Sequence, residues 1–250
     1  MTAHDYSNQF FDYIDDGART SAQHFIRVLS PWIAPKSVLD LGSGRGAWLS
    51  EWMASGLSDV IGVDGAYVDQ VNLVIPSEKF VASDLTKPVK LGRKFDLAQS
   101  LEVGEHLPNS ASATLVESLT SHSDRVVFSA AVPGQGGEFH INERPLEFWR
   151  QLFRERGYDP YDCIRPILND EATVEPWYRY NAILYLNETG RQDLSDDVIT
   201  TRIPDDVSVP HRGDLRWRLR KLAVSTLPQS VVTAIAKKRG EIMAGRKARL

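Results

Sequence analysis

The sequence Ser-Val-Leu-Asp-Leu-Gly-Ser-Gly-Arg-Gly, residues 37–46, joins a short apolar run to three glycines at alternate positions. An apolar run of this length bounded by a turn is typical of a buried strand. Gly42, Gly44 and Gly46 allow the backbone to turn sharply and to approach a ligand closely. A plain strand-to-helix turn needs only one glycine, so three of them after Asp40 predict a binding loop.

The chain around this loop alternates between short apolar runs and segments with a helical spacing of apolar residues. This alternation predicts right-handed βαβ units, and therefore a mostly parallel sheet covered by helices on both faces. In such an α/β sheet, ligands bind beyond the carboxyl ends of the strands. The expected strands are residues 37–41, 59–64, 79–82, 95–101 and 125–131, with later candidates at 163–168 and 180–186; the expected helices are most of residues 1–35, then 47–55, 113–121 and 145–156.

The composition is that of an ordinary globular protein, with 250 residues, of which 42% are apolar and 25% charged. These values exclude the disordered, collagen-like and coiled-coil classes. The single cysteine, Cys163, cannot form an internal disulfide, and no Cys/His run has the spacing of a zinc site. The first 16 residues contain acids and no apolar signal segment, and no run of 18 apolar residues occurs. We therefore expect a cytoplasmic protein without a transmembrane segment.

Charge is unevenly distributed between the body of the chain and its end. Residues 211–250 contain eleven Arg and Lys against Asp214 and Glu241, so their net charge is +9 while the other 210 residues carry −13. An acidic body argues against a nucleic-acid partner, because a basic surface should lie over such a binding face.

The basic end follows an acidic, proline-containing stretch at residues 191–212, which we expect to form a linker or an extended arm. Segments 214–224 and 228–243 then have the pattern of basic amphipathic helices. Such a tail could lie on an anionic membrane as a peripheral contact, dock on the acidic body of its own chain, or contact a second subunit in a homodimer.

The glycine spacing separates two classes of cofactor site. The dinucleotide fingerprint is G-x-G-x-x-G, which seats a pyrophosphate at a helix N-terminus, whereas residues 40–46 read D-x-G-x-G-x-G. The second expected strand ends at Asp64, whose carboxylate can accept hydrogen bonds from both hydroxyls of a ribose. Asp84 and Leu85 follow the third expected strand.

These residues resemble motif I and the following acids of the class I S-adenosylmethionine-dependent methyltransferases, over about residues 36–190. The resemblance implies a Rossmann-like sheet with an antiparallel last strand, in which the glycine loop holds the amino-acid end of S-adenosylmethionine. It also implies that Asp84 binds the adenine amino group and that the backbone amide of Leu85 meets a ring nitrogen. The expected cofactor contacts are Asp40, Gly42, Ser43, Gly44, Gly46, Asp64, Asp84, Leu85 and Ser100.

A second polar cluster, Glu102-Val-Gly-Glu-His, follows the fourth expected strand. Glu102, Glu105 and His106 stand at i, i+3 and i+4, so a helical turn would place them on one face. Two carboxylates and an imidazole suit a divalent cation such as Mg²⁺. The pattern is similar to E-x-x-E-H in magnesium-dependent quinone-biosynthesis O-methyltransferases and in small-RNA 2′-O-methyltransferases, where the metal lowers the pKa of acceptor hydroxyls. Similar segments in family members that need no metal cap a helix or orient loops.

The loop after the fifth expected strand contains a third polar cluster, His-Ile-Asn-Glu-Arg at residues 140–144. Loops after neighbouring strands flank one crevice, so His140 could face His106. A hydroxyl loses its proton when it is methylated, and histidine is a suitable general base near neutral pH. We therefore expect His140 to be either this base or a fourth metal ligand, with catalytic roles also for Glu102, Glu105 and His106.

Aromatic residues in two segments are candidates for the acceptor pocket. The N-terminal segment contributes Tyr6, the segment before the last strand contributes Trp177 and Tyr178, and Glu143 adds a carboxylate. Aromatic faces beside carboxylates suit a polyhydroxylated, uncharged acceptor such as a sugar, and each ring could equally belong to the core. The longer string at residues 129–149 resembles bacterial methyltransferases that act beside glycosyltransferases, among them actinobacterial enzymes that O-methylate mannosides of methylated polysaccharides.

The expected function is therefore S-adenosylmethionine-dependent O-methylation of a sugar hydroxyl, on a small-molecule or oligosaccharide acceptor. Two alternatives stay open: a phenolic or quinone-like acceptor, and a non-catalytic, cofactor-binding partner of a glycan-assembly complex. The expected organisation is an N-terminal helical lid at residues 1–35, a cofactor-binding domain at 36–190, and an acidic linker with a basic helical tail at 191–250.

Overall fold

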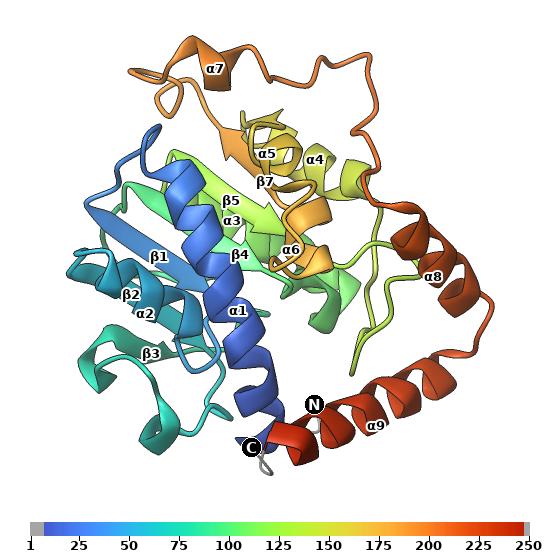
Figure 1. The fold of residues 1–250 in the computed structure, drawn as a ribbon. Helices are drawn as coiled ribbons and strands as arrows, with labels where there is room; N and C mark the ends of the chain where they lie inside the picture. Colours follow the sequence, from blue (N-terminus) through green and yellow to red (C-terminus); the bar gives the residue numbers. More distant parts are fainter. Residues whose placement is uncertain (1–7, 248–250) are drawn as a thin grey trace.

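The computed structural model describes residues 8–247, with side chains for residues 16–238. Its centre is a seven-stranded sheet in the order β3-β2-β1-β4-β5-β7-β6 (Figure 1). Only β7 runs antiparallel to its neighbours, β5 and β6, within the described residues. The predicted Rossmann-like sheet with an antiparallel last strand is therefore confirmed. The strands are β1 Ser37–Leu41, β2 Asp59–Asp64, β3 Phe80–Ala82, β4 Leu97–Leu101, β5 Arg125–Ser129, β6 Asp159–Tyr161 and β7 Ile183–Leu186.

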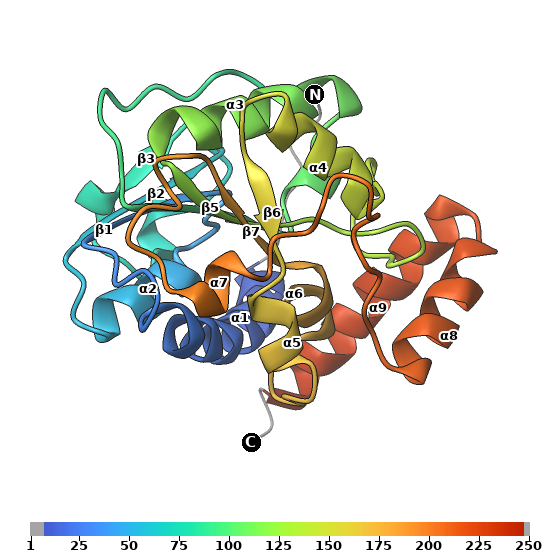
Figure 2. The same cartoon turned by 90° about the horizontal axis from the view of Figure 1, so that it is seen from above.

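Helices cover both faces of the sheet, as the view from above shows (Figure 2). Helices α1 (Asn8–Leu29), α2 (Ala47–Ala54), α5 (Ile164–Leu168) and α6 (Pro176–Asn181) lie on one face. Helices α3 (Ser112–His122) and α4 (Leu146–Arg154) lie on the other. Each face has its own hydrophobic core, and a central strand such as β1 is buried along its whole length because it contributes to both.

The sequence predicts the central strands and helices closely, and the later ones less well. Residues 163–168 were expected to form a strand, which is wrong, because they contain helix α5. A six-residue run with apolar residues on both sides of Arg165 fits a buried strand or a short buried helix equally well. Strand β6 was not expected, because its sequence is Asp-Pro-Tyr; its proline is tolerated because β6 is the last strand of the sheet, with only an isolated bridge from Tyr161 to Arg202 on its outer side.

The acidic stretch at residues 191–212 is an extended arm fastened to the body, interrupted by helix α7 (Asp196–Ile199). The buried guanidinium of Arg150 donates to the carbonyl oxygens of Pro204 and Val207, each at 2.6 Å. Helices α8 (Leu215–Ser225) and α9 (Gln229–Lys247) follow the arm and lie at the periphery of the molecule (Figure 1). Between residues 8 and 247 no helix combines the length and apolar character needed to cross a bilayer.

Candidate active site

The glycine loop joins β1 to α2 at the carboxyl edge of the sheet. Gly42, Gly44 and Gly46 have φ angles of +88°, +54° and +91°, a left-handed conformation that favours glycine. A Cβ on Gly42 would overlap the side chain of Val103, and a Cβ on Gly46 would lie 2.8 Å from Ile75. Both the backbone conformation and the lack of space therefore require glycine at these two positions.

Asp64, at the end of β2, holds this loop in place through a hydrogen bond to its backbone. Its Oδ2 accepts a hydrogen bond from the Gly44 amide at 2.7 Å, and its Oδ1 accepts from the Gly65 amide at 2.6 Å and from the Tyr67 hydroxyl. Burial raises the pKa of Asp64, and these three hydrogen bonds oppose the rise. A carboxylate oxygen can accept two hydrogen bonds, so Oδ2 retains capacity for a ligand hydroxyl.

Two further expected cofactor contacts are buried beside the loop. Asp40 lies opposite Gln99 of β4 in the sheet, and burial raises its pKa to about 7, with the Gln99 side chain opposing and the Asp64 charge adding to the rise. Ser100 is completely buried, and its Oγ has no hydrogen-bond partner among the described residues. An unpaired buried hydroxyl is costly, so a polar ligand in this crevice would suit Ser100. Ser43 is buried as well.

Asp84 and Leu85 follow β3, which runs parallel to β2 and ends at the same edge of the sheet. Asp84 is exposed, and its Oδ1 accepts hydrogen bonds from the Thr86 amide at 3.0 Å and the Thr86 hydroxyl at 2.6 Å. These hydrogen bonds, with a contribution from nearby Lys87, lower the pKa of Asp84. Leu85 packs in the hydrophobic core on the α3 side of the sheet.

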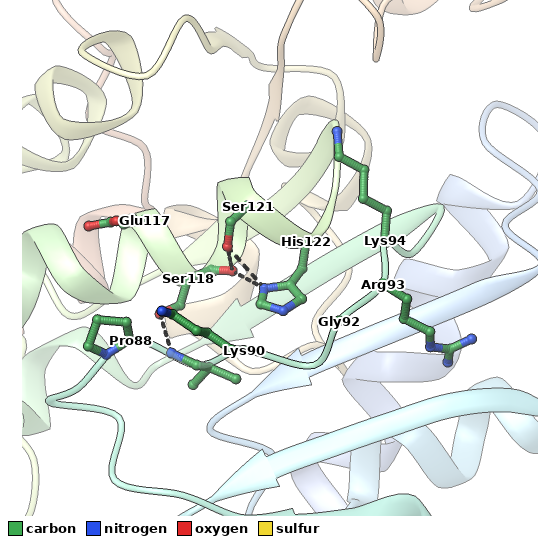
Figure 3. Close-up of a pocket in the computed structure, with 10 residues that line it drawn as sticks. Pro88, Lys90, Gly92, Arg93, Lys94, Glu117, Ser118, Ser121 and His122 are labelled. Atoms are coloured by element: carbon green, nitrogen blue, oxygen red, sulfur yellow. Dashed lines mark hydrogen bonds between the residues drawn. The ribbon is translucent and has the colours of Figure 1, made fainter.

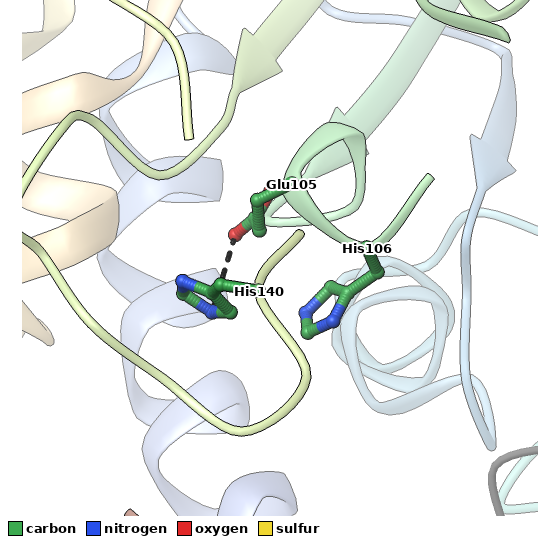
Figure 4. A group of neighbouring side chains, drawn as sticks. All are labelled: Glu105, His106 and His140. Atoms are coloured by element: carbon green, nitrogen blue, oxygen red, sulfur yellow. Dashed lines mark ion pairs between the residues drawn. The ribbon is translucent and has the colours of Figure 1, made fainter. Parts of the chain in front are cut away.

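Beyond the ends of β4 and β5, three ionisable side chains meet (Figure 4). Ligand atoms of Glu105, His106 and His140 all lie within 4.8 Å of one another. The two imidazole rings meet edge to face with centroids 4.9 Å apart, and Nε2 of His140 lies 4.0 Å from Oε1 of Glu105. The proximity of His106 and His140 that the sequence predicts is thus present in the structure.

Backbone hydrogen bonds hold the two loops of this cluster together. The amides of Ile141 and Asn142 donate to the Glu105 carbonyl oxygen at 2.8 and 3.0 Å. The buried Asn142 side chain donates to the Gly104 carbonyl oxygen at 3.1 Å and to Oγ of Ser112 at 3.0 Å. Asn142 therefore anchors the loop that carries His140, a role that its position before a helix does not reveal in the sequence.

Glu105 is the least satisfied group of the cluster. It is completely buried, and neither carboxylate oxygen has a hydrogen-bond donor among the described residues. Burial, with the charge of Glu102 adding to it, raises the pKa of Glu105 well above its usual value. A cation or a proton at this point would remove the cost of burying the charge.

Glu102 lies beside Glu105 but is not one of the three side chains whose ligand atoms are all mutually close. Its φ is +58°, so the chain turns at Glu102 and the helical turn begins only at Gly104. Its Oε2 accepts a hydrogen bond from the side chain of Gln135, which lies in the glycine-rich loop after β5. Burial raises the pKa of Glu102, and the Gln135 hydrogen bond opposes the rise.

Glu143, an expected substrate contact, has both oxygens engaged within the protein. Its Oε1 accepts from the Gly136 amide at 2.7 Å and from Nδ1 of His140 at 2.9 Å, and its Oε2 accepts from the Gly134 amide at 2.8 Å. These hydrogen bonds lower the pKa of Glu143 despite partial burial. Glu143 therefore orients His140 so that Nε2 faces Glu105.

The remaining expected acceptor contacts are aromatic. Tyr178 is buried in the core, where its ring packs edge to face on Trp48 with centroids 5.1 Å apart. Trp177 is half-buried beside it. Tyr6 lies outside the described residues.

A pocket of about 500 Å³ lies beside the segment that leads into the first residue of β4 (Figure 3). It is lined by residues 88–90 and 92–94 and by the last turns of α3, including Ser118 and His122. His122 accepts a hydrogen bond from the Leu91 amide at 3.0 Å, which ties the loop to the helix. None of the expected site residues lines this cavity.

The fold and the glycine loop define a class I S-adenosylmethionine-dependent methyltransferase. The chain belongs to the methyltransferase domain family, whose sequence profile matches residues 14–153. The curated proteins contain no match to this sequence.

Solved structures share the fold at low sequence identity. The sugar N-methyltransferase KedS8 from Streptoalloteichus sp. ATCC 53650 is 15% identical, with a TM-score of 0.56 over 75% of this chain and 96% of that chain. An O-methyltransferase family protein from Burkholderia thailandensis is 11% identical, with a TM-score of 0.53 over 70% of this chain and 59% of that chain. The plantazolicin methyltransferase BpumL, solved with SAH, is 14% identical, with a TM-score of 0.51 over 71% of this chain and 87% of that chain. The matched part of this chain thus spans less than two thirds of the Burkholderia protein.

Proposed function

We propose that this methyltransferase transfers the methyl group of S-adenosylmethionine to a hydroxyl of a sugar. The observation that carries the proposal is the convergence of Glu105, His106 and His140 beyond the ends of β4 and β5. A neutral amine can attack a methyl group through its free lone pair. A hydroxyl has a pKa far above 7 and needs a base or a cation, which such a cluster can provide.

The glycine loop and the acids around it are the proposed cofactor site. When bound there, S-adenosylmethionine supplies the methyl group. Asp64 would accept a ribose hydroxyl through Oδ2, and Ser100 would pair its buried Oγ with the ligand. The roles of Asp84 and Leu85 at the adenine come from the family resemblance alone.

His140 is the proposed general base. Because Nδ1 of His140 lies 2.9 Å from Glu143, we assign the proton to Nδ1 and leave Nε2 free to accept one. The acceptor oxygen forms its bond to the methyl carbon as the carbon–sulfur bond breaks, and the electron pair of that bond stays on sulfur. The hydroxyl proton moves to Nε2 of His140, and the Glu143 carboxylate stabilises the resulting imidazolium.

A divalent cation offers a second way to activate the hydroxyl, and the unpaired buried carboxylate of Glu105 favours it. Glu105, His106 and His140 would be its ligands, while Glu102 is held by Gln135. Two imidazoles and one carboxylate suit Mn²⁺, Fe²⁺ or Zn²⁺ better than Mg²⁺, which prefers oxygen ligands. When bound, the cation lowers the pKa of the acceptor hydroxyl, and His140 is then a ligand instead of a base.

The second part of the proposal is that the acceptor is a sugar. It is supported by half-buried Trp177, whose ring can cover an apolar sugar face, and by the resemblance of residues 129–149 to methyltransferases that act on mannosides. Tyr178 contributes core packing on Trp48. KedS8 is named a sugar N-methyltransferase, so aminosugars belong in the acceptor assay.

The test is methyl transfer to mannosides, other glycosides, aminosugars and catechols, each with EDTA and with added Mg²⁺ or Mn²⁺. Turnover of a hydroxyl glycoside supports the proposal, and its loss in EDTA with recovery in Mn²⁺ assigns the cation to Glu105, His106 and His140. Glycoside turnover that EDTA leaves unchanged assigns His140 as the base. Turnover of catechols alone, or of aminosugars at nitrogen alone, would overturn the sugar hydroxyl as acceptor.

A further inference from the structure

Helix α8 has two faces with different surroundings. On its inner face Trp217 is buried, with its ring 6.0 Å from that of Tyr180. Arg220 donates to the carbonyl oxygen of Gln135. The backbone of Lys221 lies so close to Gly134, and the side chain of Val224 so close to Gly136, that a Cβ on either glycine would overlap them. The inner face is therefore fixed to the loop after β5, and α8 is held in one orientation.

The outer face of α8 carries a stripe of exposed leucines. Leu215, Leu219 and Leu222 are 70%, 56% and 65% exposed. Their spacing of i, i+4 and i+7 places them on one side of the helix, opposite Trp217. Single exposed apolar residues are ordinary, whereas three large ones in a row mark an interaction surface.

Exposed apolar side chains continue into the turn after α8 and onto α9. Leu227, Val231 and Ile235 are 41%, 40% and 55% exposed, and the last two are one helical turn apart. Helices α8 and α9 lie together at one side of the molecule in both views (Figures 1 and 2). We call these six exposed apolar residues and the helices that carry them the tail surface.

From Leu215 to Lys238, the part of the tail surface whose side chains the structure describes, all charges have one sign. Residues 215–238 contain six Arg and Lys and no Asp or Glu. Arg216 and Arg218 are exposed and flank the leucine stripe, and Lys237 and Lys238 are exposed on α9. Leucines flanked by cations are the pattern of a helix that lies in the plane of a membrane interface.

We propose that the tail surface binds an anionic lipid surface, with the leucines entering the headgroup region and the flanking cations meeting lipid phosphates. A second copy of this chain is a poorer occupant, because pairing two such faces would bring Arg216 and Arg218 of one copy against those of the other. No helix in the described part of the chain can cross the bilayer, so this contact is peripheral. The proposal is independent of the acceptor and of methyl transfer.

The test is co-sedimentation of the full-length protein with vesicles of phosphatidylcholine alone and with vesicles that also contain phosphatidylglycerol, whose negative surface attracts basic segments. We expect binding only to the anionic vesicles, decreasing as salt screens the charges. Arg216→Gln/Arg218→Gln should weaken binding by about 25-fold, because each cation contributes roughly fivefold. Leu215→Ser/Leu219→Ser should weaken it by at least about tenfold, because the apolar insertion is lost.

Matched controls separate this surface from general charge or hydrophobicity. Lys36→Gln/Lys90→Gln removes two exposed cations elsewhere, and Val71→Ser/Ile167→Ser removes two exposed apolar side chains elsewhere. Both controls should bind like the wild type. Absence of binding to anionic vesicles would overturn the proposal, as would equal binding by the leucine variant. A dimer in sedimentation velocity that the leucine variant abolishes would assign the surface to self-association instead.

Discussion

Replacing Asp40 by Asn should stabilise this protein at pH 8 and change its stability little at pH 4. Asp40 is buried within β1, and burial raises its pKa to about 7, while the same carboxyl has a pKa of 3.8 without these surroundings. Well below pH 3.8 the carboxyl is protonated in the folded and the unfolded chain. Between pH 4 and 7 the unfolded chain releases this proton and the folded chain keeps it, so the free energy of unfolding decreases as pH rises.

The size of the effect follows from the two pKa values. They differ by about 3, and a difference of one corresponds to 1.36 kcal/mol, so the wild type loses about 4 kcal/mol between pH 4 and 7. Asn has a similar shape and cannot ionise, so Asp40→Asn avoids this loss. At pH 8 the variant should be more stable by about 4 kcal/mol, or roughly 8–16 °C in Tm for a chain of this size.

The assay is urea unfolding followed by tryptophan fluorescence at intervals from pH 4 to 8. The exposed residue Asp197 in α7 offers a matched control, and Asp197→Asn should follow the wild type at every pH. The informative quantity is the difference between Asp40→Asn and the wild type as a function of pH. A difference that stays constant from pH 4 to 8 would show that Asp40 ionises normally in the folded protein, and the reasoning would be refuted.

Three further outcomes test the site. Asp64→Ala should abolish S-adenosylmethionine binding in calorimetry, because the ribose loses a charge-assisted acceptor; unchanged affinity would remove Asp64 from the ribose site. His140→Ala should lower turnover at least about a hundredfold with cofactor affinity kept, and near-normal turnover would exclude His140 from the mechanism. Gly46→Ala should lower Tm more than Gly56→Ala, because both have positive φ but only Gly46 is crowded, by Ile75; equal losses in Tm would mean that this crowding costs nothing.

Much of the fold can be predicted from sequence because its strongest signals are local. Strands β1 and β2 have the bounds that their apolar runs predict, and the three glycines mark the turn between β1 and α2. The weaker predictions concern short segments whose structure is decided by tertiary contacts. The run at residues 163–168 becomes helix α5 around the fully buried Arg165, which donates to the carbonyl oxygens of Tyr180 and Pro210. Neither partner is close to Arg165 in sequence.

In the candidate site, too, some contacts follow from local sequence rules and others depend on tertiary contacts. The proximity of His106 and His140 follows from the rule that loops after neighbouring parallel strands meet, so the sequence can predict it. Helical spacing places Glu102 with Glu105, but φ at Glu102 is left-handed and its carboxylate, although close to Glu105, accepts a hydrogen bond from Gln135. A single residue's φ depends on its packed surroundings, which spacing does not encode. The support of Glu143 for His140 joins residues three apart, yet its hydrogen bonds to the glycine-rich loop require the folded loop.

The position of β7 between β5 and β6 has a consequence for how the chain folds during synthesis. Strands β1 to β5 can pair with one another once residue 129 has emerged from the ribosome. The outer edge of β5 then has no partner until β7, residues 183–186, has been made, and β6 joins the sheet only through β7. For more than fifty residues of synthesis the apolar edge Val126-Val-Phe128 is an open strand edge, the kind of surface on which chains aggregate. Expression of fragments that end before residue 186 should therefore give insoluble protein.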